Sequence, residues 1–128
     1  GVMYRYENGA FHPAAMLNAP EALAEFLRHR GSFQPPSTTP LDRLLQTKDV
    51  VYTADVAAES KLSAPARLGG ARSLIAVPML KENKLIGAIV IYRQEVRPFT
   101  DKQIDLVTTF AFLGVNMFLS GLHSYGEL

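Results

Sequence analysis

The residues RSLIAVPMLKENKLIGAIVIYR at positions 72–93 decide the fold. Ser73 to Leu80 is apolar and rich enough in β-branched residues for a strand, and Leu85 to Tyr92 has the same character. Glu82-Asn83 between them predicts a turn. Gly87 interrupts the second strand, which indicates a bulge or a close approach of another backbone. The stretch therefore predicts two strands paired as an antiparallel hairpin.

A second hairpin and one more strand precede this stretch. Val2 to Tyr6 alternates β-prone residues, Asn8-Gly9 tolerates the positive φ of a tight turn, and Phe11 to Leu17 forms the return strand. Val50 to Thr53 is short and β-prone, so it predicts a further strand.

The segments between and after these strands carry the sequence patterns of helices. They are predicted for Pro20–Arg30, for a short segment that follows Thr39, for one turn near Ala64–Leu68, and for a last helix that follows Thr100. Asp42 and Gln103 stand three positions after the two threonines, which is the spacing of a capping box. The order β-β-α-α-β-(α)-β-β-α predicts an α+β fold with helices over a mostly antiparallel sheet, in a single domain over residues 1–128.

Four segments resemble the GAF domain family. Arg72–Leu80 and Lys84–Arg93 are similar to the family's fourth strand and the strand after it, Glu95–Ile104 to the loop and cap before its last helix, and Phe110-Ala111 to the core of that helix. The resemblance implies a GAF-like fold of the profilin-like, PAS-related kind, with five or six antiparallel strands and helices on both faces. It implies a pocket on one face, roofed by the segments after the first hairpin and the third strand. The first family helix is expected to be absent or truncated.

The resemblance further implies a non-catalytic sensory domain, cut from a larger cytoplasmic signal-transduction protein such as a sensor histidine kinase. Such a domain binds a small molecule, forms a homodimer, or does both, and controls a kinase or other output domain. Two alternatives stay open: a dimerisation or relay module without ligand, and the regulatory domain of a transcription factor or nucleotide cyclase. The residues show no catalytic constellation, so an enzyme is not expected.

Composition excludes several classes of partner and of chemical site. The 128 residues carry a formal net charge of +1 without a basic stripe, so neither nucleic acid nor a membrane is an expected partner. The chain has no cysteine, which excludes thiolate metal sites and cysteine nucleophiles. The absence of cysteine also excludes the covalently linked bilins and the cysteine-based methionine sulfoxide reduction of some GAF proteins. No signal peptide is evident at the start, and a cytoplasmic location is expected.

Known ligand patterns of the family are mostly missing. Tyr92-Arg93 and Gln103-Ile104 depart from the paired motifs of cyclic-nucleotide GAF domains. His12, His29 and His123 lack the spacing of a metal site. We therefore expect no metal and no evident cofactor, and the identity of any small-molecule ligand stays open.

Several residues are nonetheless candidates for a pocket. Arg72 follows Gly69-Gly70, and it either binds an anion with loop amides or satisfies loop carbonyls. Asp55 and Glu59 are either paired carboxylates or solvated loop charges, of which the second is favoured. Arg67 is a weaker candidate. Alternation places strand residues on shared faces, either as pocket lining or as core. The ligand candidates are Tyr52, Asp55, Leu68, Arg72, Ile75, Val77 and Ile89.

The last helix is apolar on all sides. One sheet face buries only one stripe of a helix, so the remaining side needs a second cover. That cover is either a helix from before residue 1 or the same helix of a second chain. The predicted dimer or relay residues are Phe110, Phe112, Leu113, Phe118 and Leu119.

Overall fold

The computed structural model describes residues 1–127, with side chains described for residues 1–114. Its centre is a five-stranded sheet in the order β2-β1-β5-β4-β3. Each neighbouring pair runs antiparallel, so the predicted α+β class is confirmed. The strands are β1 (Val2–Glu7), β2 (Ala10–Met16), β3 (Val51–Thr53), β4 (Leu74–Lys81) and β5 (Lys84–Tyr92).

Both predicted hairpins are confirmed, each with a two-residue turn. Asn8 and Gly9 have φ values of 54° and 77°, and Glu82 and Asn83 have φ values of 51° and 64°. Positive φ at both central residues gives a turn whose twist matches the flanking strands. Asparagine and glycine tolerate this conformation well, which is why the sequence signals were readable.

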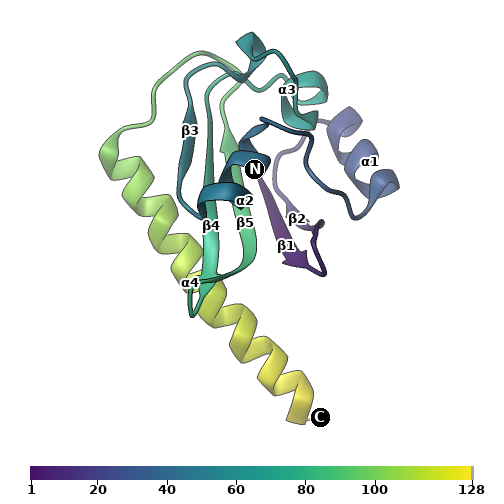
Figure 1. The fold of residues 1–128 in the computed structure, drawn as a ribbon, viewed down its shortest axis with the longest axis vertical. Coiled ribbons are helices and arrows are strands. Elements are labelled where there is room, and N and C mark those ends of the chain that lie inside the picture. The colour runs from purple at the N-terminus through teal and green to yellow at the C-terminus, as the bar shows by residue number, and fades with distance from the viewer. Residues whose placement is uncertain (128) are drawn as a thin grey trace.

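Helices cover both faces of the sheet (Figure 1). On one face lie α1 (Glu21–Arg30), α2 (Pro40–Thr47), a 3₁₀ turn at Val56–Ala58, and α3 (Ala64–Leu68). On the other face α4 (Asp101–Glu127) crosses β4 and then extends past the end of the sheet (Figure 1). Within the described residues, no helix combines the length and the apolar character that crossing a membrane requires.

Alternation in the strands divides the interior into two cores. Leu74 and Ala76 of β4 pack with α1, α2 and α3 on what we call the cavity face. Ile75 and Val77, their immediate neighbours, pack beneath α4 on what we call the α4 face. Adjacent residues of one strand therefore belong to different cores.

The capping prediction is confirmed for α4 and wrong for α2. At α4 the Thr100 main-chain N–H donates to Gln103 Oε1 at 2.9 Å, and the Gln103 N–H donates to Thr100 Oγ1 at 3.1 Å. At α2 the Thr39 hydroxyl donates to the Pro36 carbonyl at 2.6 Å, and it accepts no hydrogen bond from the first N–H groups of the helix. The Asp42 carboxylate accepts from the N–H of residue 38, one position before the expected donor.

Two small residues, Ser73 and Gly87, lie where the chain makes close contacts in or beside the sheet. The buried Ser73 hydroxyl donates to the Ala54 carbonyl at 2.7 Å and accepts from the Arg97 N–H at 2.9 Å. A Cβ atom at Gly87 would collide with the carbonyl oxygen of Tyr4. The predicted close approach at Gly87 is therefore confirmed, and the approaching backbone is β1.

The two edges of the sheet are β2 and β3. The edge strand β3 has only three residues. The edge strand β2 contains Pro13, which has no N–H to donate, and its register with β1 shifts beside Tyr4. On the outer side of β2, Phe11 exchanges two main-chain hydrogen bonds of 2.9 and 3.0 Å with Phe33.

Candidate functional site

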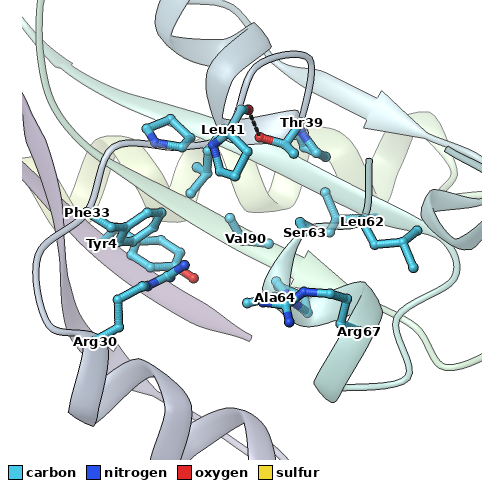
Figure 2. Close-up of a pocket in the computed structure, with 15 residues that line it drawn as sticks. Tyr4, Arg30, Phe33, Thr39, Leu41, Leu62, Ser63, Ala64, Arg67 and Val90 are labelled. Carbon is cyan, nitrogen blue, oxygen red and sulfur yellow. Dashed lines mark hydrogen bonds between the residues drawn. The ribbon is translucent and has the colours of Figure 1, made fainter. Parts of the chain in front are cut away.

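A cavity of ≈ 50 Å³ lies on the cavity face of the sheet (Figure 2). The sheet residues Tyr4, Leu74 and Val90 form its floor. Its walls and roof come from residues 30–41, after the first hairpin and α1, and from residues 62–67, after β3. This location agrees with the pocket that the family resemblance implies.

A few contacts fix the segment over the cavity. The helix α1 ends at Gly31, whose φ of 65° turns the chain back towards the sheet. Phe33 then forms its bridge with Phe11, and the Thr39 hydroxyl closes the loop onto the Pro36 carbonyl. Between these anchors the roof has no helix or strand of its own.

The floor of the cavity is apolar and contains a buried phenol. Tyr4 is 2% exposed, and its ring meets Phe11 and Phe33 edge-on, with centroid distances of 6.1 and 5.6 Å. Burial raises the pKa of the Tyr4 hydroxyl to about 12, although the charge of Arg30 opposes the shift. Tyr4 is therefore neutral at physiological pH.

Arg30 and Arg67 enter the cavity from opposite sides, with Val90 behind the space between them (Figure 2). The Arg30 guanidinium carbon lies 3.5 Å from the Phe33 ring centroid and 4.8 Å from that of Phe26, and the Arg67 carbon lies 5.2 Å from the latter. Burial lowers the pKa of Arg30, and the neighbouring charge of Arg67 lowers it further. Because a guanidinium is so strongly basic, Arg30 stays charged at neutral pH despite this lowering.

Three of the predicted ligand residues lie on the α4 face and do not line the cavity. Ile75, Val77 and Ile89 belong to the core beneath α4. Alternation showed which residues share a face, but it did not show which face a helix would cover. Leu74 and Val90, their sequence neighbours, take the positions at the cavity floor.

Two other candidates also lie outside the cavity. Tyr52 is 40% exposed and meets the Phe99 ring edge-on at 6.1 Å, on the side of α4. Leu68 is half-buried and packs against the core of the cavity face without lining the cavity. Arg67, which the sequence ranked below Arg72, is the arginine of that region that does line it.

The charged candidates are used within the fold. Arg72 Nε and Nη2 donate to the two carboxylate oxygens of Asp55 at 2.8 and 2.7 Å, and this hydrogen bonding lowers the pKa of Asp55. Glu59 accepts from Arg43 Nη2 at 3.0 Å. The arrangement favours the structural interpretation of Arg72, and it leaves neither an anion site there nor a pair of facing carboxylates.

No metal site is apparent in the described part of the chain, where no three His, Asp or Glu side chains lie close enough to hold an ion. The His12 ring lies 3.4 Å from the Glu7 carbonyl oxygen, near the first hairpin turn and away from the cavity. His123 lies outside the side chains that the structure describes.

The helix α4 turns an apolar stripe away from the sheet. Val107 and Ala111 are buried against β4, whereas Leu106, Phe110 and Leu113 are 57%, 59% and 49% exposed. These last three recur at i, i+4 and i+7, so they form one line along the helix, which we call the α4 stripe. Exposed apolar side chains in such a line are typical of a helix that packs against a partner.

The other predicted helix residues differ from the stripe. Phe112 is 67% exposed, but it stands two positions from Phe110 and therefore about 200° around the helix. Phe118 and Leu119 lie outside the side chains that the structure describes. The structure thus separates Phe110 and Leu113, which share a line, from Phe112, which does not.

Sequence reasoning missed Arg30, Phe33 and Ser63, all of which line the cavity. Two signals pointed towards them. Residues 32–40 read as a loop rich in proline, serine and threonine, and such loops often carry functional residues. Ser63 begins a helical turn, where a hydroxyl ordinarily bonds the first N–H groups, yet its Oγ has no partner among the described residues.

Comparison with known proteins gives the chain's relationships. The model of the GAF domain family matches residues 1–117. No curated protein sequence matches the chain.

Among solved structures, the GAF domain of a phosphoenolpyruvate-protein phosphotransferase from Coxiella burnetii is similar, with a TM-score of 0.76 and 13% identity over 99% of this chain and 74% of that chain. A domain assigned to a two-component sensor histidine kinase of Sinorhizobium meliloti has a TM-score of 0.71 and 16% identity over 98% of this chain and 81% of that chain. A free methionine-R-sulfoxide reductase from Thermoplasma acidophilum has a TM-score of 0.72 and 18% identity over 90% of this chain and 74% of that chain. At these identities the likeness extends to the fold.

Proposed function

Because this chain belongs to the GAF domain family, we propose that it is the sensory domain of a signal-transduction protein and that it binds a small molecule in the cavity. The observation that carries the proposal is the cavity itself, which has an apolar floor and charged side chains at its walls. Concave, largely apolar sites with a few convergent polar groups are the usual form of a ligand pocket. Relatives of the same fold include a domain assigned to a sensor histidine kinase, which is the parent type we propose.

A short route connects the cavity with α4. Leu74 and Val90 line the cavity, while Ile75 and Ile89, next to them in β4 and β5, pack beneath α4. A ligand that shifts β4 or β5 would therefore also move the adjacent strand residues on which α4 packs. Such a ligand would favour one arrangement of α4 only to the extent that it binds that arrangement more tightly.

We also propose that the domain does not catalyse a reaction. Some proteins of this fold are methionine sulfoxide reductases, but this chain has no cysteine to serve as the nucleophile of that chemistry. The cavity walls carry arginines, which donate hydrogen bonds but do not give up protons at neutral pH. The lining residues thus favour binding over acid–base chemistry.

A ligand screen with a filled-cavity variant tests the proposal. The purified chain is screened by thermal shift and calorimetry against small organic acids, nucleotides and haem. Ala64→Leu adds three carbon atoms at a buried residue of the cavity wall. At about 10–15 Å³ of such space per atom, they take up about 30–45 Å³, which is most of the free volume. It should abolish binding, whereas Ala58→Leu, at an exposed position, should bind as the wild type does.

The proposal is wrong if no compound in the screen binds, or if Ala64→Leu remains folded by circular dichroism and still binds the identified ligand. Binding that survives in the filled variant would place the ligand elsewhere on the domain.

A second function, homodimerisation, is favoured by the α4 stripe. Leu106, Phe110 and Leu113 are each about half exposed along one line of α4. We propose that this line packs against the same line of a second chain, in a two-fold arrangement where each patch meets itself. Sedimentation should then find a dimer, and a stable monomer would leave ligand sensing as the sole function proposed.

A further inference from the structure

Two arginines of the cavity have no carboxylate partner. Arg30 is the last residue of α1, and Arg67 belongs to α3. Within the described part of the chain, neither side chain forms an ion pair or a hydrogen bond, whereas the side chain of every other arginine forms at least one. Both guanidinium groups lie within 5.2 Å of the Phe26 ring centroid, so two like charges share one aromatic surface.

The lining of the cavity is positive without compensation. It includes these two arginines and no aspartate or glutamate. Two acidic side chains of the loops are already committed, Asp55 to Arg72 and Glu59 to Arg43. Because walls of low polarity concentrate the field of such charges, the cavity attracts an anion.

Two buried polar atoms of the lining have no partner. Arg30 Nε and Ser63 Oγ are both buried and make no hydrogen bond among the described residues. An Nε–H group only donates, so it requires an acceptor, and a hydroxyl is able to donate to the same kind of group. Leaving a buried donor unpaired is unfavourable. An oxygen acceptor bound in the cavity would offer either atom the partner that it lacks.

The stacking of Arg30 does not remove this requirement. Its guanidinium carbon lies 3.5 Å from the Phe33 ring centroid, so the planar group uses its face against the ring. The N–H bonds of a guanidinium lie in its plane, and they stay free to form a fork with a carboxylate. Figure 2 shows Arg30 beside Phe33 and Arg67 across the opening from it.

The size of the cavity sets the size of its occupant. Its volume is ≈ 50 Å³, and a water molecule needs about 10–15 Å³ of such space, so it holds about three to five non-hydrogen atoms. Haem or a nucleotide would enter only if the roof opened. The floor of Tyr4, Leu74 and Val90 is apolar, which suits a short hydrocarbon part better than a phosphate.

We infer that the cavity is a receptor site for a small organic carboxylate, whose two oxygens lie between Arg30 and Arg67 and whose short apolar part lies on the sheet. The inference rests on the proposed ligand-sensing function and specifies its ligand class. It assigns Arg30 and Arg67 as the residues that select the charge, and Ser63 as a further donor to the carboxylate.

Sodium propionate is the probe, with propionamide as its neutral counterpart of equal size and inorganic phosphate as an anion without an apolar part. Titrations up to tens of millimolar, at ionic strength held constant with chloride, are followed by thermal shift and by ¹H–¹⁵N NMR. Propionate should raise the midpoint of unfolding and shift the amide signals of residues 30–41 and 62–67. Propionamide and phosphate should do so at least tenfold less tightly.

Three arginine variants make the test specific. Arg67→Gln and Arg30→Gln should each weaken propionate binding about tenfold or more, because each removes charge-assisted hydrogen bonds. Arg28→Gln makes the same change of charge on the same helix as Arg30, at a side chain 57% exposed and paired with Glu21, and it should bind as the wild type does. Arg67 is exposed, so its variant should fold even if loss of the Arg30 stack weakens the roof.

The outcomes separate this inference from the proposed function. If propionamide binds as tightly as propionate and the arginine variants change nothing, the carboxylate class is wrong and the cavity remains a ligand site. If Arg28→Gln weakens binding as much as Arg67→Gln, the effect is one of overall charge, and the assignment of the two arginines is wrong. If phosphate binds as tightly as propionate, the role of the apolar floor is wrong. If propionate does not bind, the inference is overturned, and the wider screen with Ala64→Leu alone decides the proposed function.

Discussion

Replacement of Phe110 by glutamate tests whether the α4 stripe is a dimer interface. Phe110 is 59% exposed in the single chain. A phenylalanine buries about 150–250 Å², so a partner helix could cover about 120 Å² of it. At about 25 cal/mol per Å² this is worth about 3 kcal/mol in each subunit and about 6 kcal/mol in a symmetric dimer.

That sum is an upper estimate, because part of the ring stays wet at an interface. With about two-thirds of it realised, Phe110→Glu should raise the dimer dissociation constant about a thousandfold. Phe112→Glu is the matched control, since it makes the same change on the same helix at a residue that is 67% exposed and about 200° away. It should leave the dissociation constant nearly unchanged.

Sedimentation equilibrium over a range of concentrations measures both constants, and circular dichroism confirms that both variants fold. The reasoning is refuted if the wild type is a monomer at the highest concentration. It is also refuted if Phe112→Glu disrupts the dimer as strongly as Phe110→Glu, because the interface would then not follow the line of Leu106, Phe110 and Leu113.

Three further predictions concern stability. Ser73→Ala leaves the Ala54 carbonyl and a loop N–H without their partner, so the free energy of unfolding measured in urea should fall by about 1–3 kcal/mol; no change would show that water replaces the hydroxyl. Gly87→Ala forces β1 away from β5 and should lower the thermal midpoint markedly, since overpacking costs about 1–3 kcal/mol; an unchanged midpoint would contradict the close approach. The hydrogen bonds of Arg72 lower the pKa of Asp55, so their stabilisation is complete above the unfolded pKa of about 4 and is lost as the pH falls through the lower folded value. The stability advantage of the wild type over Asp55→Asn should therefore be constant near neutral pH and shrink in acid, and a constant difference down to pH 2 would contradict the ion pair.

The fold was predictable because its decisive signals are local. Asn8-Gly9 and Asn83 favour turns by their own backbone preferences. Thr100 and Gln103 specify a helix start through two hydrogen bonds between residues three apart. None of these signals depends on a distant part of the chain, so each could be read from a few letters.

The cavity was not predictable because it depends on distant residues. Alternation assigned Ile75 and Val77 to one face, but the packing of α4 decides that this face is covered. Arg30 and Arg67 come from separate helices that meet through Phe26, and no spacing in the sequence indicates that meeting. The sequence left Arg72 open between an anion site and a structural role, because its partner, Asp55, lies across a loop.

The edges of the sheet determine whether two neighbouring copies of this domain can pair through their strands. Open strand edges act as templates for another chain and lead to aggregation. Here Phe33 occupies part of the outer edge of β2, Pro13 interrupts that edge, and β3 at the opposite edge is three residues long. Strand-to-strand joining is thus disfavoured at both ends of the sheet. Two copies tethered in one assembly, at high local concentration, can therefore meet through their helices without polymerising through their sheets.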